Sequence, residues 1–184
     1  VGVVSTGDEL VADGGVLSPG QIRDSNRPGL LALVRESGFE GVDLGLVRDD
    51  EAAIESALRA GVDAWYALVT TGGVSMGDFD YVKVVLDRIG EMRWMQVAIR
   101  PAKPLAFGTV DGVPVFGLPG NPVSAMMTFE QFVRPALRKM SGFPSLFRPL
   151  VNARLGEDLE KKPGRLHFVR VRLDREGDTF VAHS

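Results

Sequence analysis

The chemistry of this sequence centres on a glycine-rich turn, GGVSMGD, which lies between an apolar run and an amphipathic helical pattern. Gly72, Gly73 and Gly77 omit side chains where the backbone must turn sharply or approach a ligand. The helix start beyond the turn favours an anion, yet Asp78 and Asp80 would repel an anion that carried no cation. The turn therefore indicates a site for phosphate with Mg²⁺. The alternative is structural, with Asp78 as the helix cap and Asp80 in the first helical turn.

Three other polar turns follow predicted strands: TGDE at 6–9, RPAKP at 100–104 and LPGNPVS at 118–124. Because ligands bind outside the carboxyl ends of the strands in open α/β sheets, we expect all these turns to share one pocket. Its acids, bases and hydroxyls would be Asp8, Glu9, Asp78, Asp80, Arg100, Lys103, Ser75 and Ser124. Carboxylates suit a hard cation, and cationic side chains suit phosphoryl groups or other oxyanions. The set therefore predicts a phosphorylated ligand that carries Mg²⁺.

Several of these residues also have a purely structural explanation. Lys103 could be an exposed loop lysine, although two prolines hold it in a stiff extended segment. Ser124 could be a first-turn helix residue, and Arg100 could pair with a carboxylate at the sheet edge. Asp24 is most simply a helix cap, and His167 in a strand pattern is interpreted as structural.

The elements that must position these turns alternate between strands and helices. Strands are expected at 1–6, 40–47, 65–70, 92–99, 105–110 and 113–118, and helices begin near 24, 49, 80 and 122. Residues 11–24 are expected to form a loop or an irregular hairpin, and Pro135 predicts a kink or break near Phe132. The alternation predicts an α/β fold of three layers, α/β/α, with a mostly parallel sheet and helices on both faces.

The composition changes near residue 147, where alternating apolar residues indicate a short all-β segment. We therefore expect an α/β domain at 1–146 and a partial β domain at 147–184. The second part is too short to be stable alone. Since the apolar strand pattern already includes Val1, the chain is interpreted as a fragment of a longer protein.

The bulk composition narrows the function classes. With 184 residues and a net charge of −3, the chain argues against a surface built for nucleic acid as a whole. It has no cysteine and only two histidines, which excludes thiol catalysis and disfavours a histidine-rich metal site. No apolar run reaches the roughly 20 residues that would span a bilayer, so no membrane partner is expected.

Five blocks in this order resemble the molybdenum insertases, that is, the MoeA and gephyrin E-domain proteins. They are STGDEL, GQIRDSN, TTGGVSMGDFDYV, RPAKPLAFG and GLPGNPVSAMMTFEQFVRPAL, and they cover about residues 1–145. The resemblance implies a molybdopterin-binding α/β domain that takes adenylylated molybdopterin with Mg²⁺, accepts molybdate and releases AMP. It implies a cytoplasmic transferase whose full-length form is a homodimer.

The resemblance also implies roles for individual residues. Asp78, Asp8 and Glu9 would hold Mg²⁺, and Asp78, Asp8 and Lys103 would be the catalytic set. The pocket would be lined by Thr6, Gly7, Gly72, Gly73, Ser75, Gly77, Asp80, Arg100, Pro119, Gly120, Asn121 and Ser124, with Asp24 and Asn26 at its border. Within this set, Lys103, Ser124 and Arg100 would hold the oxyanion.

The sequence departs from the family in several respects, and other functions stay open. Ala102 stands where the family usually has glycine, and Arg23 stands where the family usually has an aromatic residue. Because the resemblance implies amino-terminal domains that are not expected in this chain, the chain is interpreted as a fragment that binds the ligand without necessarily turning it over. The alternatives are a molybdopterin adenylyltransferase of the same fold, a gephyrin-like scaffold module without activity, and a pyrophosphatase or amidase-like relative. The adenylyltransferases look more like GGTG at the central turn.

Overall fold

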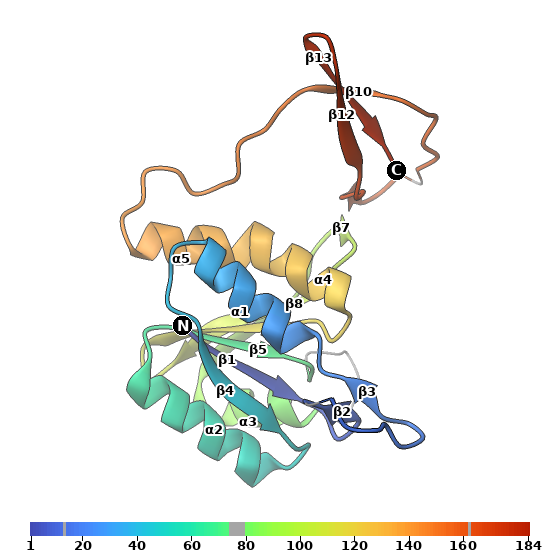
Figure 1. Cartoon of the computed structure of the whole chain (residues 1–184). Helices are drawn as coiled ribbons and strands as arrows, with labels where there is room; N and C mark the ends of the chain where they lie inside the picture. Colours follow the sequence, from blue (N-terminus) through green and yellow to red (C-terminus); the bar gives the residue numbers. More distant parts are fainter. Residues whose placement is uncertain (13, 74–79, 162) are drawn as a thin grey trace.

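The chain folds around one mixed sheet, as seen in a computed structural model that describes residues 1–12, 14–73, 80–161 and 163–184 (Figure 1). The strand order in this sheet is β4 (Val42–Val47), β1 (Gly2–Thr6), β5 (Leu68–Thr71), β9 (Val113–Leu118), β8 (Pro104–Val110) and β6 (Glu91–Gln96). Its central strands β1 and β5 are buried along their whole length, as their unbroken apolar and β-branched runs predict.

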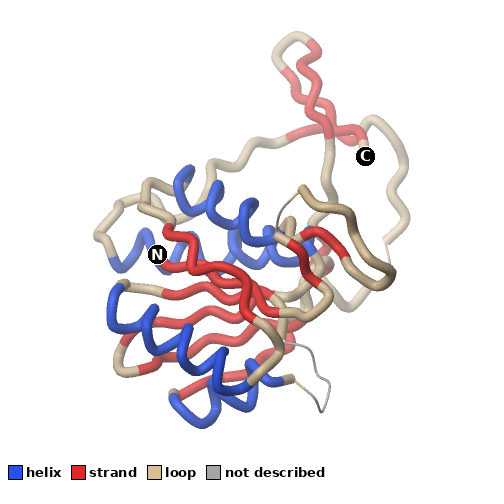
Figure 2. Tube along the Cα trace, turned by 60° about the horizontal axis from the view of Figure 1, so that its bottom comes forward, coloured by secondary structure: helices blue, strands red, loops and turns tan. Residues whose placement is uncertain are grey.

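Helices cover both faces of the sheet (Figures 1 and 2). One face carries α1 (Asn26–Glu36), α4 (Pro122–Thr128), a π-helical turn (Phe129–Val133) and α5 (Arg134–Met140). The other face carries α2 (Glu51–Ala64) and α3 (Tyr81–Ile89). Each face has its own apolar core, centred on Phe129 and Val69 in the first and on Ile54, Leu68 and Leu86 in the second. The predicted three-layer α/β fold is confirmed.

Strand directions bring the polar turns to one edge. Strands β4, β1, β5 and β9 are parallel, so the turns that follow them lie side by side. Strand β8 is antiparallel to β9, and its first residue, Pro104, therefore lies at the same edge. The segment that carries Lys103 thus lies at the same edge as the turns after β1, β5 and β9, as the sequence predicts.

Two local predictions had different outcomes. The hairpin alternative for residues 11–24 is wrong, because β2 (Leu10–Val11) and β3 (Ile22–Arg23) pair in parallel. The predicted interruption of the last long helix is confirmed as a π-helical turn, where the Arg134 N–H bonds to the Phe129 carbonyl. Pro135 follows directly and has no N–H to donate, which explains why the ordinary helical bonding pattern changes here.

The C-terminal strands form a separate small sheet that stands away from the three layers (Figures 1 and 2). It consists of β10 (Ala153–Leu155), β13 (Thr179–His183) and β12 (Arg172–Glu176). The last two strands are antiparallel, but β10 runs parallel to β13. A further short strand, β11 (Leu166–His167), pairs with β7 (Ile99–Arg100) of the main body. The domain boundary near residue 147 stays a prediction.

Among the described residues, no helix is both long enough and apolar enough to cross a bilayer.

Candidate functional site

A pocket of about 740 Å³ opens at the edge of the sheet where the polar turns meet. Its volume lies within the range typical of small-molecule sites. The predicted residues that line it are Thr6, Gly7, Glu9, Gly72, Gly73, Asp80, Arg100, Lys103, Pro119, Gly120, Asn121 and Ser124. Most of the predicted site is therefore brought together by segments that lie far apart in the sequence.

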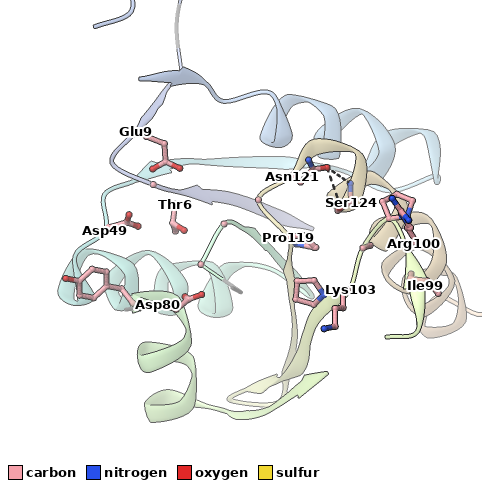
Figure 3. Close-up of a pocket in the computed structure, with 18 of the residues that line it drawn as sticks. Thr6, Glu9, Asp49, Asp80, Ile99, Arg100, Lys103, Pro119, Asn121 and Ser124 are labelled. Carbon is pink, nitrogen blue, oxygen red and sulfur yellow. Dashed lines mark hydrogen bonds between the residues drawn. The ribbon is translucent and has the colours of Figure 1, made fainter. Parts of the chain in front are cut away.

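Acidic side chains gather at one end of the pocket (Figure 3). Glu9 follows β1, Asp49 follows β4 and Asp80 caps α3 by accepting a hydrogen bond from the Lys83 N–H at 3.2 Å. Burial raises the pKa of the Asp49 carboxyl, and the nearby carboxylates of Asp8 and Glu9 raise it further. A cation at this end would relieve the repulsion among these carboxylates.

Cationic side chains gather at the other end. Arg100 and Lys103 come from the segment between β6 and β8 (Figure 3). Arg165 comes from the C-terminal segment, directly before β11. Within the described part of the chain, none of the three has an ion-pair partner, and all three are exposed. Unneutralised cations that face one pocket suit an anionic ligand.

The turn after β9 supplies a hydroxyl to the same end. Asn121 caps α4, its Oδ1 accepting hydrogen bonds from the Ser124 N–H at 3.1 Å and from Ser124 Oγ at 3.3 Å. Pro122 at the first helical position fits this cap, as the sequence predicts. Ser124 therefore has a structural role as a donor, and it also lines the pocket.

The glycines after β5 are required by the protein's own packing. Gly72 has a φ of +89°, and a Cβ there would lie 2.5 Å from the Thr6 carbonyl oxygen. Gly73 has a φ of +65°, and a Cβ there would lie 2.3 Å from Val82 Cγ2. The hydroxyl Oγ1 of Thr6 is buried beside this turn and has no hydrogen-bond partner among the described residues. Thr6 itself lines the pocket, so this unpartnered polar atom lies within the pocket wall.

Asp24 and Asn26 lie behind the pocket and do not line it. Asn26 Nδ2 donates to Thr71 Oγ1 and to the Gly120 carbonyl, both at 2.8 Å, and so ties together the ends of β5 and β9. Asp24 accepts hydrogen bonds from Ser5 Oγ at 3.1 Å and from the Arg27 side chain at 2.8 Å. Both residues support the pocket walls from the core.

Other predicted residues lie elsewhere. Ser75, Gly77 and Asp78 fall outside the described residues. Asp8 lines a neighbouring cavity, where its Oδ1 accepts from the Asp49 N–H at 3.2 Å. Among the described residues, no group of three or more histidine, aspartate or glutamate side chains is placed so that it could hold a metal ion.

Two charged residues of the pocket, Asp49 and Arg165, were not among the predicted site residues. The sequence offers Asp49 or Asp50 as the cap of the helix that begins near residue 49. Asp50 is the cap, since its side chain accepts a hydrogen bond from the Ala53 N–H at 2.8 Å, which leaves another role open for Asp49. Its position directly after a strand beside β1 was the signal that could have identified it. Arg165 carried no such signal, because its approach depends on the pairing of β11 with β7.

Comparisons with known proteins agree on one family. Residues 2–139 match the family described as "probable molybdopterin binding domain". A molybdopterin molybdenumtransferase of Haemophilus influenzae is 43% identical over 171 residues, which are 92% of this chain and 42% of that protein. Molybdopterin molybdenumtransferase 2 of Mycobacterium tuberculosis is 39% identical over an alignment of 188 residues that covers 98% of this chain and 46% of that protein. The chain thus spans less than half of the length of these relatives.

Solved structures show the same likeness. Two molybdopterin biosynthesis MoeA proteins from Pyrococcus horikoshii have TM-scores of 0.78 and 0.73 at 33% and 26% identity. They cover 100% and 98% of this chain, and the match spans 44% and 42% of their own length. The molybdopterin biosynthesis enzyme MoaB from Thermus thermophilus has a TM-score of 0.59 at 19% identity, covers 77% of this chain and spans 95% of that protein, which shows the shared fold alone.

Proposed function

The chain belongs to the MoeA family of molybdopterin-binding proteins, and from this premise we propose that its pocket binds adenylylated molybdopterin with Mg²⁺ and accepts molybdate. In the whole protein this site would insert molybdenum into the dithiolene while water cleaves the adenylyl phosphate link and AMP leaves. The activity would be that of a cytoplasmic, homodimeric molybdopterin molybdenumtransferase.

One observation supports this proposal above all: acidic and cationic side chains lie at opposite ends of the pocket. Acids at Glu9, Asp49 and Asp80 lie at one end, and exposed cations at Arg100 and Lys103 lie at the other (Figure 3). A ligand that brings both a phosphate-bound cation and an oxyanion matches both ends at once. A ligand with only one sign of charge would leave the other end unmatched.

The acidic end fits Mg²⁺, provided that the ligand completes the coordination. Mg²⁺ is usually held by one or two carboxylates together with substrate phosphates and water. Glu9 and Asp49 offer two carboxylates close enough to affect each other's charge, and Asp80 lies in the same lining. When bound, the ion would neutralise phosphate charge and orient the adenylyl link. Asp78 and Asp8 stay candidates for the same task.

The cationic end fits a tetrahedral oxyanion. Lys103 and Arg100 can donate charge-assisted hydrogen bonds, and the Ser124 hydroxyl would add a neutral donor if it turned from Asn121 Oδ1 to the ligand. Arg165 is a further cation at this pocket. The protein needs no sulfur ligand of its own, because the ligand supplies the dithiolene.

The test of this proposal follows AMP by chromatography. Adenylylated molybdopterin is incubated with the protein and Mg²⁺, with and without molybdate. We expect the compound to be retained by the protein, and AMP to appear only after molybdate is added if the chain can turn over. Consumption of ATP on plain molybdopterin would instead indicate an adenylyltransferase, and failure to retain the adenylylated compound would contradict the proposal.

A further inference from the structure

The cationic segment of the pocket has little regular structure of its own. Residues 97–103 contain only the two-residue strand β7, and one main-chain bond closes the loop, from the Val97 N–H to the Lys103 carbonyl at 2.8 Å. Ala102 has a φ of +77°, a conformation that L side chains disfavour. Such a conformation persists only where the surroundings impose it. The position of Lys103 must therefore be fixed partly from outside the segment.

The C-terminal segment makes the contacts that could fix it. The Leu166 N–H donates to the Ala98 carbonyl at 2.9 Å, and the Phe168 N–H donates to the Arg100 carbonyl at 2.8 Å. Leu166 lies in register with Ile99, which is only 7% exposed. The two hydrogen bonds thus hold the segment on both sides of Ile99, directly before the turn that leads to Lys103.

The same pairing places a further charge. Arg165 directly precedes β11 and lines the pocket together with Arg100 and Lys103. Three like charges around one cavity repel one another, and an anion between them removes that repulsion. Binding of an anion and pairing of β11 with β7 should therefore favour each other, because such coupling is reciprocal.

We propose that β11 is a positioning element for the oxyanion end of the pocket: the N–H groups of Leu166 and Phe168 hold the 97–103 segment where Arg100 and Lys103 can meet an anion. This inference rests on the proposed function for the identity of the anion. The positioning itself concerns only the chain and can be measured without any ligand.

The test removes one donor and keeps its neighbours. Phe168→Pro deletes the N–H that bonds to the Arg100 carbonyl. Phe168→Ala removes only the ring and keeps that N–H. Val169→Pro makes the same backbone change one residue later, at an N–H for which the described structure shows no main-chain partner. These two variants are the matched controls.

Two readouts judge the variants. The first is amide hydrogen exchange without ligand: we expect the Val97 amide to exchange several-fold faster in Phe168→Pro than in the two controls. The second is molybdate affinity by calorimetry: we expect it to be weaker by roughly 3- to 10-fold in Phe168→Pro, as for one lost hydrogen bond, and to change less than twofold in the controls.

The outcomes separate the positioning from the function. Unchanged exchange at Val97 in Phe168→Pro would overturn the positioning role, as would unchanged molybdate affinity in that variant. If the unmodified protein does not bind molybdate, the identity of the anion is wrong. The exchange measurement then still decides whether β11 holds the segment.

Discussion

Asn26 offers a test of how the pocket walls are held together. Its side chain is buried and donates two hydrogen bonds of 2.8 Å, to Thr71 Oγ1 and to the Gly120 carbonyl. Asn26→Ala removes both. A buried intramolecular hydrogen bond contributes about 0.5–1.5 kcal/mol, so the loss is about 1–3 kcal/mol. For a chain of this size, each kcal/mol lowers the melting temperature by about 2–4 °C.

The assay is urea unfolding of the purified chain followed by circular dichroism, with Ser25→Ala as the matched control. Ser25 is the neighbouring residue, is exposed and makes no side-chain cap hydrogen bond at the start of α1. We expect Asn26→Ala to lower the free energy of unfolding by about 2 kcal/mol and Ser25→Ala to leave it nearly unchanged. If both variants unfold at the same urea concentration as the parent, the bridge between β5 and β9 contributes nothing and this reasoning is refuted.

Three further predictions concern the pocket itself. Gly72→Ala should lower the free energy of unfolding by about 2–4 kcal/mol, because the φ of Gly72 is +89° and the added Cβ would lie 2.5 Å from the Thr6 carbonyl oxygen. Thermal unfolding measures this loss, with Gly120→Ala as the control, since the nearest atom to a Cβ at Gly120 is 4.0 Å away. Asp49→Asn should raise stability at neutral pH, because folding raises the pKa of this carboxyl from its ordinary 3.8 and so disfavours its charged form. That gain should vanish in melting curves below about pH 3.8, where both states are protonated, and a gain that persists there would contradict the cause given. Lys103→Ala should weaken molybdate binding by roughly 10- to 100-fold and leave molybdopterin binding within about twofold, as measured by calorimetry; an equal loss of both would show that the pocket has no separate oxyanion end.

Local sequence patterns predicted the fold because each layer follows from hydrophobic periodicity. Strand β5 is a continuous apolar and β-branched run and is buried at every position, and α3 places Val82, Val85 and Leu86 on one buried face. The Asp111-Gly112 turn between β8 and β9 follows from turn chemistry alone. These signals act over a few residues, so a sequence displays them directly.

The site was predictable only where a residue follows a strand. Glu9, Lys103 and Ser124 could be placed because parallel strands end at one edge of the sheet. Arg165 could not, because a two-residue pairing across more than 60 positions of sequence brings it to the pocket. Asn26 looked like a pocket residue but supports the wall from behind, since side-chain direction depends on how α1 packs.

Calorimetric titration of the chain with molybdopterin, with and without Mg²⁺, tests the central claim most directly. We expect binding of micromolar affinity or tighter with Mg²⁺, which is about −8 kcal/mol or better, and clearly weaker binding once the ion is removed. An absence of binding in both buffers, or an affinity that does not depend on Mg²⁺, would contradict the claim that this pocket, with acids at one end and cations at the other, is a site for a phosphorylated pterin and its cation.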